Sequence, residues 1–153
     1  CFLWIRVNNM TIVVGILLMT FALVASISLA AKSATRRALD AAEQLGASYV
    51  TVARLVGAYG TEGGLVRGSG AVAVHPGRLI YTLGRPARTH TLVLQPDTTV
   101  EVTRTLDFPG RKAVLFVPSV VVRTGSGGMA LMVKLPEELA AAVSAAVPGG
   151  TTR

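Results

Sequence analysis

Residues 10–31 read MTIVVGILLMTFALVASISLAA, a run of 22 residues without a charged side chain. About 20 apolar residues in a helix are enough to cross the hydrocarbon core of a bilayer. In the whole chain of 153 residues, 51% are hydrophobic and 15% are charged, and the mean hydropathy is +0.55. Because the excess of apolar residues is concentrated in this run, the sequence predicts a membrane-inserted helix here.

The composition excludes two classes of protein. A disordered chain has low hydrophobicity, and a small disulfide scaffold needs several cysteines, whereas this chain is apolar and has one Cys. Fifteen Lys and Arg against eight Asp and Glu give a net charge of +7. This charge permits contact with nucleic acid, anionic lipid or acidic glycans, and it does not choose among these partners.

A helical period continues beyond the apolar run. From Ala31 to Val56, small and apolar residues recur at alternating steps of four and three, and the same phase runs back to Met10. We therefore expect one continuous helix over residues 3–58, about 80 Å long, which ends at a group of glycines. Its seam is expected to pack against other copies of the chain through Val13, Val14, Leu17, Phe21, Val24, Ser28, Leu29, Ala31, Ala38, Ala42, Leu45, Tyr49, Val52 and Val56.

The remainder of the chain has the pattern of short strands. Runs rich in Val, Leu and Thr are separated by turn signals such as Pro76-Gly77 and Pro109-Gly110, and they cover residues 71–75, 78–83, 90–94, 98–106, 113–122 and 129–135. Pro118 inside one run predicts an edge, a bulge or two shorter strands there. Residues 136–147 begin with Pro-Glu-Glu and predict a short helix, apolar nearly all round, that packs on the sheet or on a neighbouring subunit.

These patterns predict an α+β fold. We expect a long hydrophobic helix in residues 1–60, followed by a small antiparallel head, sandwich-like or barrel-like, with a C-terminal helix in residues 61–153.

No catalytic or metal-binding motif is visible. His75 and His90 stand at strand ends outside any recognisable triad and are expected to face solvent, and Cys1 lacks the spacing to join them in a metal site. We therefore predict a protein that is not an enzyme and binds no cofactor. Four basic residues at turns are candidates for contact with phosphate or acidic sugar, or simply belong to a solvated surface: Arg85, Arg88, Arg111 and Lys112.

Residues 29–60 have a pattern that is similar to a segment of a known protein family. In this segment Lys32, Ser33, Ala34 and Thr35 are followed by Glu43, by Gly46-Ala47-Ser48, and by Val52, Val56 and Gly57. The pattern resembles the amphipathic half of the N-terminal helix of archaellins and related archaeal type IV pilins.

The resemblance implies an extracellular filament subunit for adhesion or motility. Its helix is first held in the membrane, is cleaved by a prepilin-type peptidase and is transferred to an assembly platform. It then packs with identical subunits in the filament core, with β-rich heads outside. Position 5 is Ile5, whereas bacterial pilins have Glu there.

The charges around the apolar run support a different interpretation. Lys32, Arg36 and Arg37 follow the run and Arg6 precedes it. The positive-inside rule then places the β-rich part in the cytoplasm. The alternative is a single-pass membrane protein whose cytoplasmic β domain acts as an anchor or as an accessory subunit of a membrane complex. An anchored hydrolase is a third alternative, which the lack of a catalytic motif disfavours.

Overall fold

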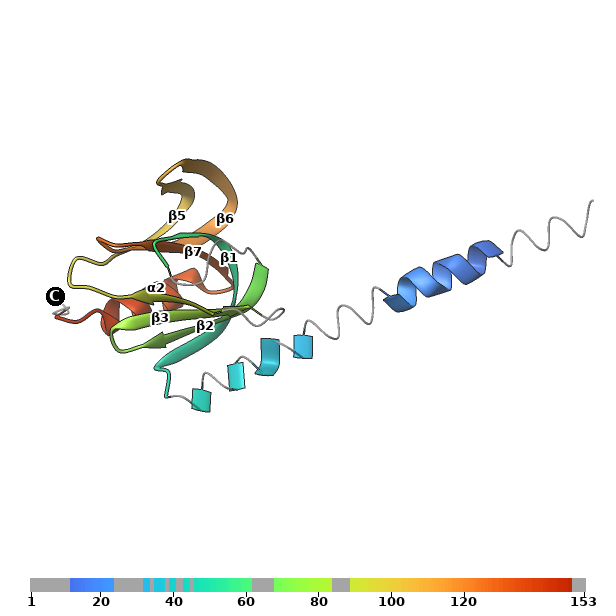
Figure 1. Ribbon diagram of the computed structural model, residues 1–153, viewed down its shortest axis with the longest axis horizontal. Helices are drawn as coiled ribbons and strands as arrows, with labels where there is room; N and C mark the ends of the chain where they lie inside the picture. The colour runs from blue at the N-terminus through green and yellow to red at the C-terminus, as the bar shows by residue number, and fades with distance from the viewer. Residues whose placement is uncertain are drawn as a thin grey trace, which may run out of the picture. The chain divides into compact units, whose positions relative to one another are not determined.

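The computed structural model describes residues 12–23, 32–33, 35–37, 39–40, 43–44, 46–61, 68–83 and 89–149. The chain divides into two compact units, Cys1–Ser33 and Ala34–Arg153. In the first unit residues 12–23 form a helix, called the N-terminal helix below. The second unit, called the β domain, contains β1 (Tyr49–Tyr59), β2 (Gly68–His75), β3 (Arg78–Leu83), β4 (Thr89–Val93), β5 (Thr99–Phe108), β6 (Arg111–Arg123), β7 (Gly128–Val133) and α2 (Pro136–Ala146) (Figure 1).

The seven strands form one antiparallel sheet in the order β4-β3-β2-β1-β7-β6-β5. Strands β1 to β4 pair with one another in chain order, and so do β5 to β7, whereas β4 and β5 are the two edge strands of the sheet. The pairing of β1 with β7 joins the two halves. Figure 1 shows that the sheet is strongly curled, with α2 in the hollow of the curl. The expectation of an α+β fold with a sandwich-like head is therefore wrong, because the residues that the structure describes are mostly β and their strands belong to a single sheet.

The main core lies between the sheet and α2. Alternate residues of the strands point toward α2, among them Leu55, Val72 and Leu131, and all three are buried. From α2, Leu139 and Val143 are completely buried in the same cluster. The predicted C-terminal helix and its packing on the sheet are thus confirmed, and α2 supplies the layer that closes the core.

The expectation of a continuous helix over residues 3–58 is wrong. Helical residues 43–44 are followed by Gly46, which has a φ of 75° and whose N–H donates to the Glu43 carbonyl, as at a helix end. The chain then enters β1, where Ala53 and Leu55 are buried and Arg54 is exposed. This alternation has the period of a strand. Residues 50–52 are Val-Thr-Val, and β-branched side chains favour strands over helices.

The residues of the expected packing seam are therefore divided. Tyr49, Val52 and Val56 lie in β1, while Val13, Val14, Leu17 and Phe21 lie in the N-terminal helix. The others fall outside the described residues: Val24, Ser28, Leu29, Ala31, Ala38, Ala42 and Leu45. The resemblance to archaellins and type IV pilins is wrong, since it required one helix through residue 56 and the chain is a strand there.

Two bulges shape the β5–β6 end of the sheet. In β1 the pairing with β7 shifts between Leu55 and Gly57, which leaves Val56 as an extra residue. In β6, residues 115–118 lie opposite the single residue Arg104 of β5, because Thr103 pairs with Ser119 and Thr105 with Val114. Of the three alternatives predicted from Pro118, an edge, a bulge or two shorter strands, the structure shows the bulge within one strand.

The bulge in β6 changes the direction of the hairpin, because extra residues on one strand bend it. In Figure 1 the β5–β6 end curls away from the rest of the sheet. Beyond the bulge, Leu106 and Phe108 are buried in a second cluster with Val121 and Ala130. The ring of Phe108 meets that of Tyr59 edge to face, with centroids 4.8 Å apart. The hairpin end thus has its own apolar contacts with β1.

Candidate functional site

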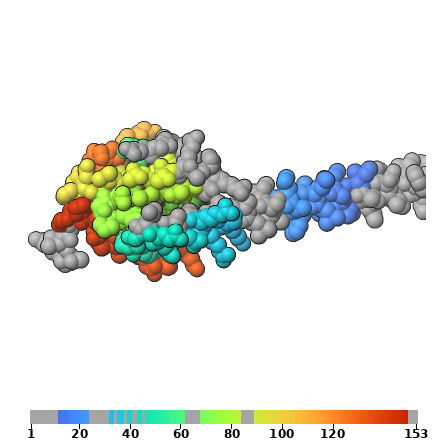
Figure 2. All heavy atoms as spheres, turned by 60° about the horizontal axis from the view of Figure 1, so that its bottom comes forward, coloured from blue at the N-terminus to red at the C-terminus, as the bar shows by residue number. Residues whose placement is uncertain are grey.

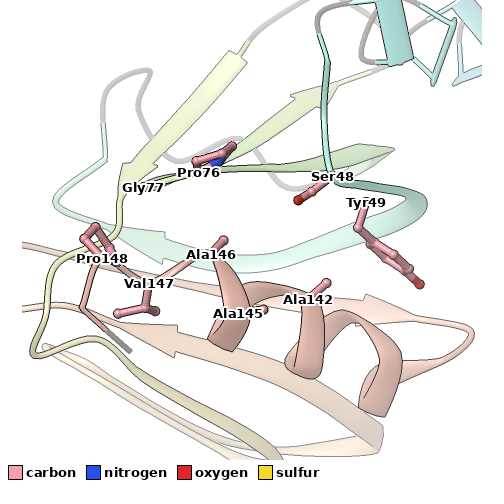
Figure 3. A pocket seen from close by; sticks show the side chains of 9 residues that line it. All are labelled: Ser48, Tyr49, Pro76, Gly77, Ala142, Ala145, Ala146, Val147 and Pro148. Carbon is pink, nitrogen blue, oxygen red and sulfur yellow. The ribbon is translucent and has the colours of Figure 1, made fainter. Parts of the chain in front are cut away.

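A groove lies where the C-terminal end of α2 meets the start of β1 and the β2–β3 turn. It has a volume of about 710 Å³, within the range of ligand sites, and is lined by Ser48, Tyr49, Pro76, Gly77, Ala142, Ala145, Ala146, Val147 and Pro148. Figure 3 shows the alanines of α2 on one side and Ser48, Tyr49 and Pro76 on the other. No lining side chain is a carboxylate or a cation, so the groove suits an apolar ligand or segment.

Hydrogen bonds to two backbone carbonyls fix the walls of this groove. The Gly77 N–H donates to the Ala146 carbonyl at 2.9 Å, which ties the β2–β3 turn to the end of α2. Gly77 has a φ of 73°, and the Pro-Gly sequence fits a turn whose third residue has positive φ. On the far wall, the Ser48 hydroxyl donates to the Val74 carbonyl at 3.0 Å. The groove is therefore preformed.

The Tyr49 hydroxyl is a second polar group of the groove, besides that of Ser48. The Tyr49 hydroxyl donates to Oε2 of Glu138 at 3.4 Å, a long hydrogen bond between β1 and α2. Burial of the phenol, and then the negative charge of Glu138, raise the pKa of Tyr49 above its ordinary value. Tyr49 is thus neutral at physiological pH, and because its single O–H is donated to Glu138, the phenol oxygen can orient a ligand by accepting one hydrogen bond.

The basic candidates do not gather into one site. The guanidinium of Arg111 donates to the Val56 carbonyl at 3.1 Å, so it satisfies the extra residue of the β1 bulge and holds the hairpin end. Lys112 pairs with Asp107 at 3.4 Å on the exposed surface. Arg85 and Arg88 lie outside the described residues. Arg111 therefore has a structural role that its sequence position did not reveal.

The two histidines are placed differently from the prediction. His75 and His90 are both buried, whereas they were expected to face solvent. The imidazole of His90 lies 6.2 Å from the ring of Tyr81, the residue opposite it on β3. Burial, and then the charge of Arg78, lower the pKa of His75. Within the described ranges, no three His, Cys, Asp or Glu side chains come close enough to hold a metal ion.

The N-terminal helix is the other unusual surface. Its large apolar side chains are all exposed, and Met19 and Phe21 are 78% and 75% exposed. At 3.6 residues per turn, apolar residues at positions 12, 13, 14, 16, 17 and 18 lie on every side of the helix. Figure 2 shows one face of this helix in blue. A helix that is apolar all round belongs in a protein core or in a membrane. Among the helices that the structure describes, none is at once long and apolar enough to cross a membrane.

Comparison of the chain with known proteins identifies no relative. No protein family matches the chain, and neither curated proteins nor solved structures give a match. The candidate sites are therefore the groove and the N-terminal helix, as the residues themselves define them.

Proposed function

We propose that the protein is a single-pass membrane protein whose β domain is an accessory binding module of a membrane complex. The uncharged run of residues 10–31 is the anchor. The β domain binds a partner subunit through the groove between α2 and β1.

The observation that carries this proposal is the uncovered apolar surface of the N-terminal helix. Its twelve described residues span about 18 Å at 1.5 Å per residue. A helix over all 22 uncharged residues, as we propose for the anchor, would span about 33 Å, which matches a bilayer core of about 30 Å. Burying large apolar side chains is worth about 1.5–3 kcal/mol each. Nine such side chains are exposed on this helix, so an apolar environment would stabilise it strongly.

The charges next to the run favour a cytoplasmic β domain. Lys32, Arg36 and Arg37 stand within six residues after it. Basic residues near the end of a membrane helix stay on the cytoplasmic side. We therefore propose that the chain leaves the membrane on the cytoplasmic side and continues into β1.

Glycosylation mapping tests this orientation. Asp97→Asn creates an Asn-Thr-Thr acceptor in an exposed turn of the β domain. The chain also has an Asn-x-Thr sequence at Asn9-Met10-Thr11. Asn9→Gln removes this acceptor in every variant, so that any glycan reports on the turn. Translated into microsomes, the Asp97→Asn chain is expected to stay unmodified and to sediment with the membranes. A glycosylated β domain would place it on the opposite side and overturn the proposed orientation.

Interaction through the groove is tested on α2. Ala145 lines the groove, and Ala141 is an exposed residue of the same helix that does not. The complex is extracted in mild detergent and its size is measured by native electrophoresis. Ala145→Arg is expected to release the chain from the complex, because it puts a long cation into an apolar groove. Ala141→Arg is the matched control and leaves the complex intact.

Both variants are expected to leave the Tm of the β domain unchanged, since neither residue is in the core. A complex of unchanged size with Ala145→Arg would show that the groove is not the binding surface.

A further inference from the structure

Three exposed apolar side chains lie at the bulge of β6, Phe116 and Val117 within it and Val114 directly before it, and we call these three residues the apolar bulge. Phe116 is 99% exposed and Val114 is 82% exposed. They stand on the β5–β6 hairpin where it curls away from the sheet (Figure 1). A phenylalanine that is exposed to this extent makes almost no contact with its own domain.

The bend of the hairpin does not require apolar side chains there. The bend comes from the extra backbone residues opposite Arg104. The buried contacts of the hairpin end are made by Leu106 and Phe108, with Leu115 packed against them. Phe116 could be polar without loss of any of these contacts, so its apolar character is left for a contact outside the domain.

The charges around the apolar bulge select the partner. In residues 104–118 the basic side chains are Arg104, Arg111 and Lys112, and the acidic one is Asp107. Arg104 and Lys112 are exposed, Lys112 in its ion pair with Asp107, while the guanidinium of Arg111 contacts the Val56 carbonyl. Three basic residues against one acidic residue give the segment a net charge of +2, with Arg104 as its main outward cation. Amphipathic helices that lie in the headgroup region of anionic bilayers combine Trp, Phe or Leu with Lys and Arg, and the surface around the apolar bulge has the same combination of residue types. Each basic residue near such a surface adds to the attraction.

The chain also keeps this hairpin close to a membrane if the proposed anchor is correct. Seventeen residues, 32–48, separate the apolar run from β1. Even fully extended, this segment reaches about 60 Å. The β domain is therefore confined near one leaflet, where a weak contact is enough for binding.

We propose that the apolar bulge inserts into the headgroup region of the same bilayer, as a second, anionic-lipid contact of the β domain. This inference rests on the proposed anchor. It commits to lipid as the partner because the exposed surface combines a small apolar tip with an excess of positive charge. A protein partner at this surface is an alternative outcome of the test.

A tryptophan reporter tests the inference. Phe116→Trp is made in the full chain with Trp4→Phe, which removes the one native Trp. Since Phe116 is fully exposed, the larger ring causes no clash. The protein is reconstituted in nanodiscs of phosphatidylcholine with and without phosphatidylglycerol, and with brominated acyl chains in a parallel sample. The matched control is Val93→Trp on the exposed side of the edge strand β4.

With anionic lipid, the Phe116→Trp emission is expected to shift to shorter wavelength and to lose intensity when the lipids are brominated. Both effects weaken without phosphatidylglycerol, and both weaken when Arg104→Gln and Lys112→Gln are added. The Val93→Trp emission stays at the wavelength of exposed indole and is not quenched. If the reporter at position 116 is not quenched in nanodisc-bound protein, the inference is overturned. If its emission is nevertheless shifted to shorter wavelength, the surface is assigned to protein contact.

The same samples separate this inference from the anchor. If the chain does not co-elute with nanodiscs in size-exclusion chromatography, the proposed anchor fails. If it co-elutes and the reporter is not quenched, the anchor stands and the lipid contact of the bulge is wrong.

Discussion

Arginine at both Leu17 and Leu18 is expected to release the chain from membranes washed with alkaline carbonate. Both leucines are exposed in the N-terminal helix and lie near the middle of the uncharged run. An Arg near the centre of a membrane helix costs about 2.5–3.5 kcal/mol on insertion scales. Two of them cost about 5–7 kcal/mol, enough to cancel the insertion of a run of this length.

The matched control carries two arginines in the β domain, Val52→Arg and Val93→Arg. Both of these valines are exposed on strands, so the added charges meet water. This variant is expected to remain in the membrane pellet. The anchor would be refuted if the Leu17→Arg, Leu18→Arg chain stayed in the pellet as fully as the unaltered chain.

Gly70→Ala is expected to lower the free energy of unfolding of the β domain by about 3 kcal/mol, the upper end of the usual cost of overpacking. A Cβ at Gly70 would lie 2.0 Å from the Thr82 carbonyl oxygen of the neighbouring strand β3. The obstacle is backbone in a sheet pair, so β2 and β3 would have to separate.

The measurement is the Tm of the β domain in the full chain in detergent, with unfolding monitored by circular dichroism. For a domain of this size, about 3 kcal/mol corresponds to a fall in Tm of roughly 12–24 °C. Gly57→Ala is the control, because a Cβ there meets its nearest atoms at an ordinary 3.5 Å. Equal Tm values for the two variants would contradict the close approach of β2 and β3.

Much of the β domain could be predicted from the sequence because its signals are local. The runs expected at residues 71–75, 78–83 and 90–94 overlap β2, β3 and β4. The Pro76-Gly77 turn and the start of α2 at Pro136 also agree with the prediction. These features depend on turn residues and on alternation within a few positions, which the chain specifies without its neighbours.

The first strand was missed because residues 49–56 fit two periods. Tyr49, Val52 and Val56 recur at helical steps, and they also belong to a strand in which Ala53 and Leu55 face inward. The β-branched residues 50–52 indicate a strand. The helical phase of the uncharged run 10–31 continues through them, however, and it favoured the prediction of a helix. The error then supported a family resemblance that depended on the same helix.

The candidate site could not be found in the sequence. The groove joins Ser48, Pro76 and Ala146, which lie far apart in the chain and meet through the curl of the sheet and the packing of α2. Its alanines have no chemical signature. The role of Arg111 at the β1 bulge depends in the same way on a long-range contact. Sequence periodicity does not contain such information.

Photolabelling from within the bilayer tests the central claim most directly. The unaltered chain is reconstituted in phosphatidylcholine that carries a diazirine at the end of one acyl chain, then irradiated and digested with trypsin. Cleavage after Arg6 and Lys32 isolates the apolar run as the peptide of residues 7–32. We expect lipid adducts on this peptide and none on peptides from the β domain. A peptide 7–32 without adducts would contradict the anchor, and with it the proposal of a membrane-attached β domain.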